Sequence, residues 1–397
     1  MVTVEEAFRI IGSVVAKMEV EDCPILVSVG RILAEPVRAD RDFPPFNRVS
    51  MDGIAIDSGS FLAKGQRFFI QGVQPAGVPT SSLKDRSSCI EVMTGAVLPL
   101  NTNAVIRYED LELKDGNAHV LIDQVEKGMN IHAQGKDAKQ GDELLKVGQR
   151  ISAAEVAVLA SVGKESVRVF TFPKTAVVSS GDELVEIDDT PQPHQIRKSN
   201  THALRAAMID IGWRTESFHL LDDKDLVKRN LRTILENDDV IILSGGVSKG
   251  KFDFIPEALE ELGIQKLFHQ ISQRPGKPFW FGASADRSKI VFALPGNPVS
   301  TFLCYYRYIK PWILKCFGVD QMPMTARLTS HVNFNNPLTY FLQVRVEFKD
   351  GEFLAHPYAG GGSGDFANLK EVDGFLELPL DQSTFKAGES YPYISFR

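Results

Sequence analysis

The stretch LSGGVSKGKFDF (243–254) contains residues whose types and spacing suit the binding of an anion. Gly245 and Lys251 follow the spacing of a phosphate-binding P-loop, but Phe252 stands where that motif needs a hydroxyl group for magnesium. A P-loop helix would begin at the Gly-Lys pair, and Pro256 would then break its first turns. We therefore interpret the stretch as a loop whose backbone amides hold an oxyanion, followed by a helix that begins near Pro256.

Small and acidic residues follow three more apolar runs in this part of the chain. SSGDE (179–183) follows AVV, LPGNPVS (294–300) follows IVFA, and Asp222 with Asp223 ends another run. In an open α/β sheet, ligands bind beyond the carboxyl ends of the strands. The glycines could serve only to permit tight turns. Their repetition beside Ser, Asp and Glu favours one shared binding site.

The PGNPVS cluster has the pattern of a helix start. Asn297 is a favourable N-cap residue, and Pro298 suits the first helical position, where no backbone N–H is needed. The free amides that follow form an anion site, and Gly296 lets a ligand approach the backbone closely. Nearby, RPGKP places Arg274 and Lys277 on a constrained turn, which suits a tetrahedral oxyanion unless the turn is simply solvated.

A second set of polar candidates lies earlier in the chain. Asp52 precedes Gly53 in NRVSMDGIAI, where the pair could also form a hairpin turn. Thr94 follows the run CIEVM, and Asp137 lies in the polar loop NIHAQGKDAKQGD. Carboxylates of this kind can hold a metal ion or act in proton transfer.

The elements that must position these residues change in type along the chain. Residues 4–18 show the periodicity of an amphipathic helix, and short β-like runs continue to about 146. SAAEVAVLASVG predicts a helix capped by Ser152. From 174, strands alternate with helices, the last of which is expected to be a long helix over NPVSTFLCYYRYIKPWILKCFG. Such alternation predicts a mostly parallel sheet covered on both faces.

The predicted fold is therefore multidomain α/β plus β. Its parts are a small helical and extended N-terminal region (1–45 with 147–173), an inserted β-rich domain (46–146), a central three-layer α/β domain (174–318) and a C-terminal β-barrel-like domain (319–397).

Composition limits the classes of function. The chain has 397 residues, of which 43% are hydrophobic and 24% charged, and a formal net charge of −7, which argues against a general nucleic-acid surface. The four cysteines form no C-x-x-C pair and are expected to be buried free thiols. We find no signal peptide and no apolar run of the ~20 residues that span a membrane. We expect a cytoplasmic protein without a membrane segment.

Taken in order, the motifs resemble those of one family. They are PPFNRVSMDGIAI, VMTGAVLP, NIHAQGKDAKQGD, SSGDELVE, HQIRKSN, LSGGVSKGKFDF, RPGKPFWFG, LPGNPVS and GSGDFANLKEVDGFLELP. From about residue 4 to 397 the chain resembles the MoeA family of molybdopterin molybdenumtransferases, which includes the E domain of gephyrin. SGGVS and PGNP are shared with the related molybdopterin adenylyltransferases. The MDG stretch, the RPGKP turn and the C-terminal β-domain favour MoeA.

The resemblance implies a chemistry and an assembly. In this family molybdate is inserted, with magnesium (Mg2+), into the dithiolene of adenylylated molybdopterin, and AMP is released. The family also implies an obligate homodimer, in which the α/β domain of one subunit and the β-rich domain of the other build a shared site. A molybdopterin adenylyltransferase is the implied partner that supplies the substrate.

Matched motif by motif, the resemblance implies roles for individual residues. Candidates for holding magnesium or activating the attacking water or oxyanion are Asp52, Asp137, Glu183, Asp222 and Asp253, of which Glu183, Asp222 and Asp253 are the metal-ligand candidates. Candidates for binding phosphate and molybdate are Thr94, Gly245, Gly246, Ser248, Arg274, Lys277, Pro295, Gly296, Asn297, Pro298 and Ser300.

Two departures from the family pattern concern cations. Family members usually carry a lysine where this chain has Gln270, so one cation of the pocket is missing or replaced. Members often have an Arg-containing segment before the last β stretch, and here Arg345 is the residue that aligns. Two other functions stay open. One is an adenylyltransferase that uses ATP one step earlier, and the other is a non-catalytic scaffold that binds a partner protein, as the gephyrin E domain does besides its chemistry.

Overall fold

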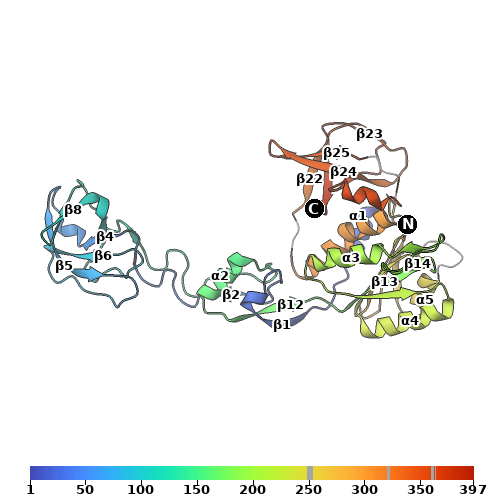
Figure 1. The fold of residues 1–397 in the computed structure, drawn as a ribbon, viewed down its shortest axis with the longest axis horizontal. Coiled ribbons are helices and arrows are strands. Elements are labelled where there is room, and N and C mark those ends of the chain that lie inside the picture. The colour runs from blue at the N-terminus through green and yellow to red at the C-terminus, as the bar shows by residue number, and fades with distance from the viewer. Residues whose placement is uncertain (248–253, 320–321, 359–361, 363) are drawn as a thin grey trace. The chain divides into compact units, whose positions relative to one another are not determined.

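The computed structural model describes residues 1–247, 254–319, 322–358, 362 and 364–397. The chain divides into two compact units. The larger unit comprises Met1–Ala34, Val147–Ile151 and Val167–Arg397, and the smaller unit comprises Glu35–Lys146 and Ser152–Ser166. In Figure 1, β13 and α3 to α5 belong to the larger unit, and β4, β5, β6 and β8 to the smaller one. The smaller unit therefore interrupts the larger one twice along the chain.

The larger unit is built on a six-stranded sheet in the order β16-β13-β17-β21-β20-β18. The first four strands are parallel neighbours, whereas β20 pairs antiparallel with both β21 and β18. The predicted mostly parallel sheet is confirmed. The strands are β13 (Thr175–Ser180), β16 (Glu216–Leu220), β17 (Val240–Ser244), β18 (Gln265–His269), β20 (Trp280–Ala283) and β21 (Ile290–Leu294).

Alternate residues of the central strands face opposite cores. Val177 and Ile242 belong to one hydrophobic cluster, and Val178 and Leu243 to another. The first cluster includes residues of α1, α3, α6 and α7, and the second includes residues of α4 and α5. Helices thus cover both faces, as expected for a sheet buried on two sides. They are α1 (Val4–Gly12), α3 (Asn200–Ile209), α4 (Lys224–Asn237), α5 (Ile255–Glu261), α6 (Pro298–Cys304) and α7 (Lys310–Cys316).

Two helices differ from their predictions. The helix expected over 4–18 ends at Gly12, where the Ser13 hydroxyl donates to the carbonyl oxygen of Ile10 at 2.7 Å and competes with helical bonding. The long helix expected after Asn297 is present from Pro298 to Cys316, but it is not α-helical throughout. A π-helical turn, Tyr305–Ile309, separates α6 from α7, because Pro311 has no N–H to donate to the preceding turn.

The C-terminal part of the larger unit is a closed barrel. Strands β24, β25, β22, β28 and β26 pair in that order, and β24 also pairs with β26, which closes the ring. The barrel-like prediction is therefore confirmed. The strands are β22 (Met324–Leu328), β24 (Thr339–Lys349), β25 (Glu352–Pro357), β26 (Gly374–Leu378) and β28 (Ser390–Ser395). The short strand β19 (Gln273–Arg274) pairs in parallel with β24.

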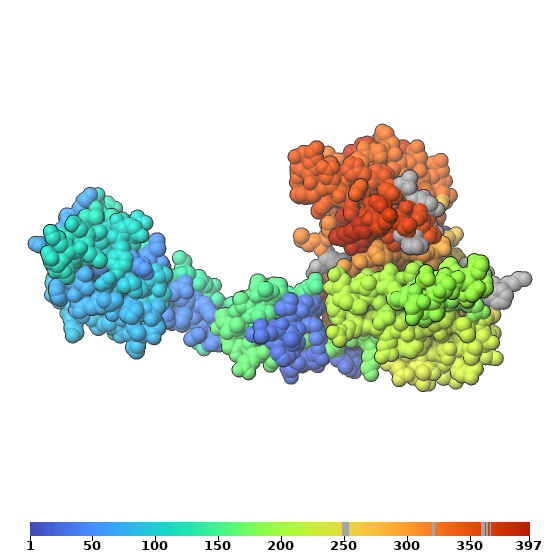
Figure 2. Space-filling view, viewed as in Figure 1, coloured from blue at the N-terminus to red at the C-terminus, as the bar shows by residue number. Residues whose placement is uncertain are grey.

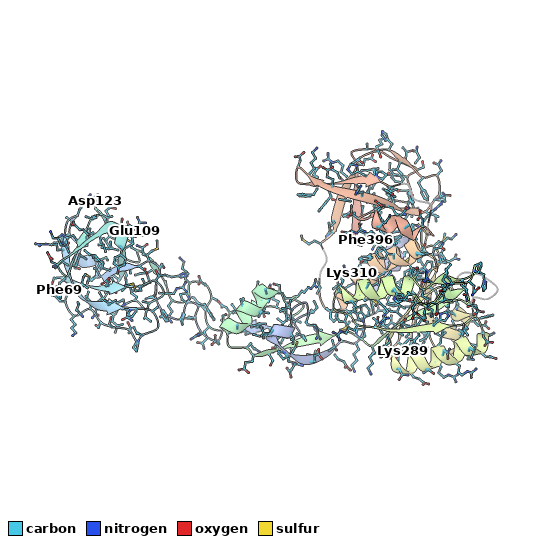
Figure 3. The ribbon with its side chains drawn as sticks, viewed as in Figure 1. Phe69, Glu109, Asp123, Lys289, Lys310 and Phe396 are labelled. Atoms are coloured by element: carbon cyan, nitrogen blue, oxygen red, sulfur yellow. The ribbon has the colours of Figure 1, made fainter. Side chains whose placement is uncertain are left out.

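Aromatic side chains join the barrel to the α/β part, and Figure 2 shows these two parts in contact. The ring of Phe396 lies 4.9 Å from that of Phe302 in α6 and 5.8 Å from that of Tyr306. The ammonium group of Lys310 lies 5.2 Å from the Tyr306 ring centroid. Phe396 and Lys310 are labelled in Figure 3. Cavities between these two parts are therefore bounded by packed elements of one unit.

The smaller unit contains a six-stranded sheet in the order β7-β4-β6-β5-β9-β8. Ile54 and Ala55 of β4 belong to opposite hydrophobic clusters, so both faces of the sheet are packed. Gly53 begins β4, which lies between β6 and β7, so Asp52 and Gly53 are not the centre of a hairpin turn. The strands are β4 (Gly53–Ile56), β5 (Arg67–Gln74), β6 (Ser88–Val92), β7 (Ala104–Arg107), β8 (Leu111–Lys114) and β9 (Asn117–Val120).

The remaining elements are short. Helix α2 (Ala153–Ser161) begins after Ser152, whose side chain accepts from the backbone N–H of Ala154, as the predicted cap requires. The paired strands are β1 (Glu19–Pro24) with β12 (Ser166–Thr171), β2 (Val37–Arg38) with β11 (Glu143–Leu145), β3 (Arg48–Val49) with β10 (Ile131–His132), β14 (Leu184–Val185) with β15 (Ile196–Arg197), and β23 (Val332–Asn333) with β27 (Thr384–Phe385).

The cysteines carry free thiols. Cys23, Cys89 and Cys304 are buried, and Cys316 is partly buried. Burial raises the pKa of Cys89 to about 12, so this thiol is inert at neutral pH. In the described part of the chain, none of the helices combines the length and the apolar character needed to traverse a bilayer.

Candidate functional site

The carboxyl ends of four neighbouring strands meet at one edge of the α/β sheet. The register pairs Ser180 with Leu220, and Ser244 with Leu294. The segments that follow these residues line a cavity of about 950 Å³, which we call the rim cavity. The predicted site residues that line it are Glu183, Asp222, Gly245, Gly246, Pro295, Gly296, Asn297 and Pro298. Clusters far apart in the sequence thus come together in space.

A buried hydroxyl group lies in the wall of the rim cavity. Ser180 Oγ has no hydrogen-bond partner among the described residues. Gly246, with φ of +69°, comes so close that a Cβ there would lie 2.8 Å from Ser180 Oγ and would collide with Ile255. Only glycine permits this approach. A buried polar group without a partner beside an open cavity is suited to contact a ligand.

Two residues that sequence reasoning did not select also shape the rim cavity. Asn200 Nδ2 donates to Ser244 Oγ at 2.8 Å and to the carbonyl oxygen of Gly296 at 2.7 Å, which ties two rim loops together. Lys198 is buried, and its ammonium pairs with Glu186, which lowers the pKa of that carboxyl. Both lie in HQIRKSN, where three polar residues, Lys198 to Asn200, at the start of a helix were the available signal.

Glu183 and Asp222 are the metal-ligand candidates that the structure describes. Both line the rim cavity, and a Cβ at Gly181 would lie 2.8 Å from Glu183 Cδ, so this carboxyl group folds against the backbone. Asp253 and Ser248 lie outside the described residues. In the described ranges, no group of three or more His, Cys, Asp or Glu is arranged to hold a metal ion. A pair of carboxylates nevertheless fits magnesium, which usually takes its other ligands from water and substrate phosphates.

The helix that follows residues 243–254 begins after the Gly-Lys pair and not at it, as the rejection of a P-loop predicted. Helix α5 starts at Ile255 and has Pro256 in its first turn. Residues 248–253, which include Lys251, lie outside the described part of the chain. The loop itself therefore stays a prediction.

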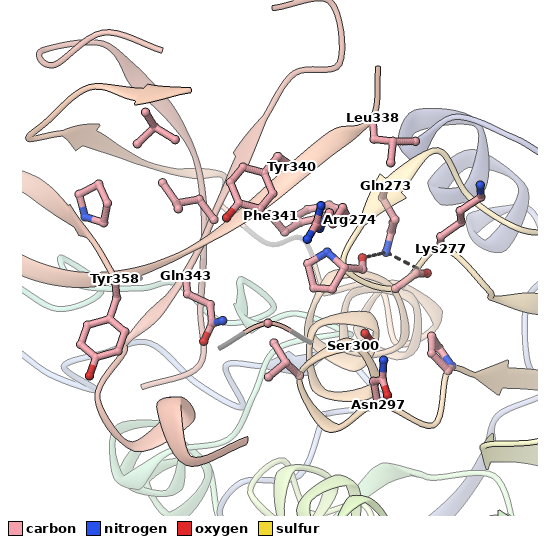
Figure 4. Close-up of a pocket in the computed structure, with 18 of the residues that line it drawn as sticks. Gln273, Arg274, Lys277, Asn297, Ser300, Leu338, Tyr340, Phe341, Gln343 and Tyr358 are labelled. Atoms are coloured by element: carbon pink, nitrogen blue, oxygen red, sulfur yellow. Dashed lines mark hydrogen bonds between the residues drawn. The ribbon is translucent and has the colours of Figure 1, made fainter. Parts of the chain in front are cut away.

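A second cavity, of about 670 Å³, lies between the RPGKP turn and the barrel, and we call it the cationic cavity. Arg274, Lys277, Asn297 and Ser300 line it together with Tyr340 of β24 (Figure 4). Its described lining contains no acidic residue, and the ion pairs of the described residues include neither Arg274 nor Lys277. Two cations in a cavity without carboxylates attract an anion.

Aromatic rings support one of these cations. The guanidinium carbon of Arg274 lies 5.9 Å from the ring centroid of Phe334, whose ring stacks on Tyr340 at 4.3 Å. The register of β19 and β24 places Arg274 beside Tyr340. Burial raises the pKa of Tyr340, and Arg274 partly opposes this shift. The Tyr340 hydroxyl is therefore protonated at neutral pH and can donate a hydrogen bond to an anion.

The two cavities adjoin each other. Pro278, Pro295 and Asn297 line both of them. A ligand held in the rim cavity would therefore reach an anion held in the cationic cavity near Asn297. Asn297 occupies the predicted N-cap position of α6, and Pro298 begins the helix as expected, although the Asn297 side chain makes no capping hydrogen bond.

The residue that stands in place of the usual family lysine lies apart from the described linings of both cavities. Gln270 is not among the described residues that line either cavity, and its backbone N–H donates to the carbonyl oxygen of Phe279 at 2.9 Å. Arg345 does not line them either. Gln343, two residues earlier on β24, does, and its buried Oε1 has no hydrogen-bond partner among the described residues. Sequence reasoning missed Gln343, although it belongs to the segment that contains Arg345.

The predicted residues of the smaller unit form two separate contacts. Asp52 Oδ1 accepts hydrogen bonds from the backbone N–H and the hydroxyl group of Thr94, and these bonds lower its pKa. Asp137 Oδ1 lies 2.8 Å from His132 Nε2, and Arg48 Nη2 lies 3.4 Å from His132 Nδ1. Arg48 can only donate, so the tautomer that fits both contacts has its proton on Nε2, facing Asp137.

Three family models together match most of the chain. Residues 2–163 match the MoeA N-terminal region (domain I and II), residues 176–315 match a probable molybdopterin binding domain, and residues 325–396 match the MoeA C-terminal region (domain IV). The matches follow the order in which the motifs of the resemblance occur.

Relatives and solved structures agree with these models. The molybdopterin molybdenumtransferase of Synechocystis sp. is 38% identical over 93% of this chain and 93% of its own length, and that of Staphylococcus epidermidis is 32% identical over 91% and 87%. The crystal structure of the molybdopterin biosynthesis MoeA protein from Pyrococcus horikoshii is 31% identical, with a TM-score of 0.84 and coverage of 100% of this chain and 99% of that one. The resemblance seen in the motifs is therefore confirmed.

Proposed function

Because this chain belongs to the MoeA family of molybdopterin molybdenumtransferases, enzymes of molybdenum cofactor biosynthesis, we propose that it inserts molybdate into adenylylated molybdopterin and releases AMP. The observation that carries the proposal is the pair of adjoining cavities. One combines buried polar groups with carboxylates, the other contains cations without carboxylates, and they share Asn297.

Molybdate is assigned to the cationic cavity. It is a tetrahedral dianion, and Arg274 and Lys277 supply two positive charges that no described carboxylate neutralises. The hydroxyl groups of Ser300 and Tyr340 line the same cavity and can donate to its oxygens. These groups bind and orient the anion beside Asn297.

The pterin substrate is assigned to the rim cavity. Ser180 Oγ and the backbone at Gly245 and Gly246 face a space that can accept a phosphate group. Asn200 fixes two of the loops around this space, and Lys198 contributes a buried positive charge that is partly balanced by Glu186. Sulfur atoms of a substrate bound here would reach the molybdate near the shared wall.

Magnesium is assigned to the acidic side of the rim cavity. Glu183 and Asp222 would hold it, together with Asp253 if the family pattern applies. When bound, the ion supplies positive charge to the phosphoanhydride that is cleaved. One of these carboxylates would also accept a proton from a water molecule, whose oxygen would bond to a phosphorus of the phosphoanhydride while the bond from that phosphorus to the oxygen of AMP breaks.

We further propose that the enzyme is a homodimer with shared sites. Asp52, Thr94 and Asp137 are candidates of the same reaction but belong to the smaller unit. Asp52 is held in its charged form by Thr94, which suits a group that acts on a cationic or metal-bound partner. In this proposal a second copy of the chain brings these residues to the rim cavity.

Two alternatives predict different products. An adenylyltransferase would consume ATP and molybdopterin and release pyrophosphate, and a scaffold would turn over neither substrate. The matches of both flanking regions, residues 2–163 and 325–396, to MoeA models support the molybdenumtransferase.

The test is AMP release by the purified protein with adenylylated molybdopterin, molybdate and magnesium. We expect AMP to form, and to depend on molybdate and on magnesium. Arg274→Gln and Lys277→Gln should each weaken molybdate binding by about tenfold or more, because each removes a charge-assisted contact. Lys349→Gln, at the end of β24 and outside the cavity lining, is the matched control. Pyrophosphate release from ATP, or no turnover at all, would contradict the proposal.

A further inference from the structure

A buried carboxamide lies directly behind the cationic turn. Gln273 precedes Arg274 and has no exposed surface. Its Nε2 donates back to the carbonyl oxygens of the turn, at 3.0 Å to Pro275 and 3.4 Å to Gly276, as the dashed lines in Figure 4 show. The side chain thus holds the two residues that separate Arg274 from Lys277.

The other end of the same carboxamide is also held. Its Oε1 accepts a hydrogen bond from the hydroxyl group of Tyr308, which is fully buried in the π-helical turn. Burial raises the pKa of Tyr308 well above its ordinary value, so this hydroxyl is a permanent donor. Because the carbonyl oxygens of the turn can only accept, Nε2 must face them and Oε1 must face Tyr308, so the orientation of the carboxamide is determined.

The turn rests on this carboxamide without a gap. A Cβ at Gly276 would lie 2.6 Å from Gln273 Nε2 and 3.0 Å from Cys304 Sγ. On the other side, Gln273 and Arg274 pair with Thr339 and Tyr340 of the barrel. The turn is therefore clamped between the π-helical turn and β24, and Gln273 is the residue that contacts both.

We propose that Gln273 is a positioning residue for oxyanion binding, which it promotes by holding the backbone between Arg274 and Lys277 in the conformation that lines the cationic cavity. The inference rests on the proposed function of that cavity. Neither Gln273 nor Tyr308 is required to touch the anion. Removal of the carboxamide leaves two turn carbonyls and the Tyr308 hydroxyl without their partner, so the turn reorients and its cations lose their preorganised spacing.

The first variants remove the network without changing any charge. Gln273→Leu fills a similar volume but cannot hydrogen-bond, and Tyr308→Phe removes the group that orients the carboxamide. We expect isothermal titration calorimetry to show molybdate affinity reduced by about tenfold in Gln273→Leu, and by a smaller factor in Tyr308→Phe. KM for molybdate should rise in both, with less change in kcat.

Tyr305→Phe is the matched control. Tyr305 lies in the same π-helical turn, is equally buried, and donates its hydroxyl to the carbonyl oxygen of Ala207 at 3.1 Å, away from the cationic turn. Its loss should lower the thermal unfolding midpoint in the same way as Tyr308→Phe and leave molybdate affinity unchanged. Equal weakening of molybdate binding in both tyrosine variants would mean that general destabilisation is responsible, and the inference would be wrong.

Gln273→Glu provides a rescue that depends on pH. The protonated acid keeps one donor for the turn and one acceptor for Tyr308, whereas the carboxylate faces the turn carbonyls with no donor. Burial raises the pKa of the introduced acid above its ordinary value of about 4.3, so affinity should be near that of the wild type at low pH and fall as pH rises. The wild type should show no such fall over the pH range in which molybdate stays a dianion.

The outcomes separate this inference from the proposed function. Molybdate binding that depends on Arg274 but is unchanged in Gln273→Leu would overturn the inference alone. Absence of molybdate binding by the wild-type protein would overturn both.

Discussion

One oxygen of Asp52, Oδ1, accepts two hydrogen bonds from Thr94, at 2.6 Å from the backbone nitrogen and 2.7 Å from Oγ1. Asp52 precedes β4 and Thr94 follows β6, and these strands are antiparallel neighbours. Both bonds favour the charged carboxylate and lower the pKa of Asp52. The family motif implied that Thr94 binds substrate. In the structure, its two hydrogen bonds stabilise the charged form of Asp52.

Thr94→Val should raise the pKa of Asp52 towards its ordinary value, because the larger of the two causes, the hydroxyl bond, is lost. Because the pKa of Asp52 is lower in the folded state than in the unfolded state, its ionisation stabilises the fold at pH values above the unfolded-state pKa. This stabilisation disappears as the pH falls through the folded-state pKa. The variant should therefore lose this contribution at a higher pH than the wild type. Carboxyl chemical shifts followed by NMR during an acid titration measure the change. Thr94→Ser keeps the hydroxyl and should behave as the wild type. An unchanged pKa in Thr94→Val would contradict the assignment.

The shared site predicts complementation between inactive subunits. Chains with Asp52→Ala and chains with Asp222→Ala should each be inactive alone. Mixed at equal amounts, they should recover about a quarter of wild-type AMP release, because half the dimers are mixed and each of these keeps one intact site. Native mass spectrometry verifies subunit exchange. No recovery in verified mixed dimers would show that each subunit builds its site alone.

Gly246→Ala should be far more damaging than Gly263→Ala. Both glycines have positive φ, so both variants incur a similar backbone cost of about 1 kcal/mol. Only at 246 would the new Cβ meet Ser180 and Ile255, since nothing lies within 4 Å at 263. We expect a small drop in melting temperature for Gly263→Ala, and a much larger drop together with strongly reduced AMP release for Gly246→Ala. Similar behaviour of the two variants would remove the case for a close approach at the rim cavity.

Gln343→Arg should tighten molybdate binding, because it adds a cation to a cavity that Gln343 lines with a buried, unpartnered oxygen. A contact of this kind is worth about 1.5–3 kcal/mol, or roughly tenfold or more in affinity. Gln270→Lys, the substitution suggested by the family pattern, should change affinity by less than about threefold, since its charge would be screened outside the described cavity lining. Calorimetry on both variants decides which position completes the site. Tighter binding in Gln270→Lys alone would reverse the assignment.

Lys251→Ala tests the interpretation of the opening stretch. In a P-loop this lysine contacts the terminal phosphates, and its loss would nearly abolish turnover. In an oxyanion loop followed by a helix that starts at Ile255, the effect should be mild, whereas Asp253→Asn should be severe because a carboxamide binds magnesium poorly. AMP release by folded, dimeric variants is the measurement. Equal damage from both substitutions would restore the nucleotide-loop reading.

Much of the fold could be predicted from the sequence because the rules involved are local. Apolar periodicity and glycine-containing turns identified the strands of the α/β sheet, and Ser152 identified a helix start through its capping pattern. The grouping of Ser180, Asp222, Gly245 and Pro295 at one edge also followed, because parallel strands bring their carboxyl ends together.

Predictions from local sequence rules failed where a single residue, or a contact with a distant part of the chain, determines the structure. Periodicity predicted the long helix after Asn297 but not the π-helical turn within it, which precedes Pro311, a residue with no N–H to donate. Gln270 was selected by its distance in sequence from Arg274, but it adopts a left-handed backbone at φ of +80° and is not among the described residues that line the cavities.

The sequence by itself determined the family, the alternation of strands and helices, and the residue types that an anion site requires, because these depend on neighbours within a few positions. Only the tertiary structure decided that Gln273 contacts Tyr308 and that Gln343 lines the same cavity as Arg274. The residues of these two pairs are 35 and 69 positions apart in sequence, and the second pair is brought to one cavity because the barrel packs on the α/β part through β19 and β24. Such packing minimises exposed apolar surface over the whole unit, and no short stretch of sequence contains that information.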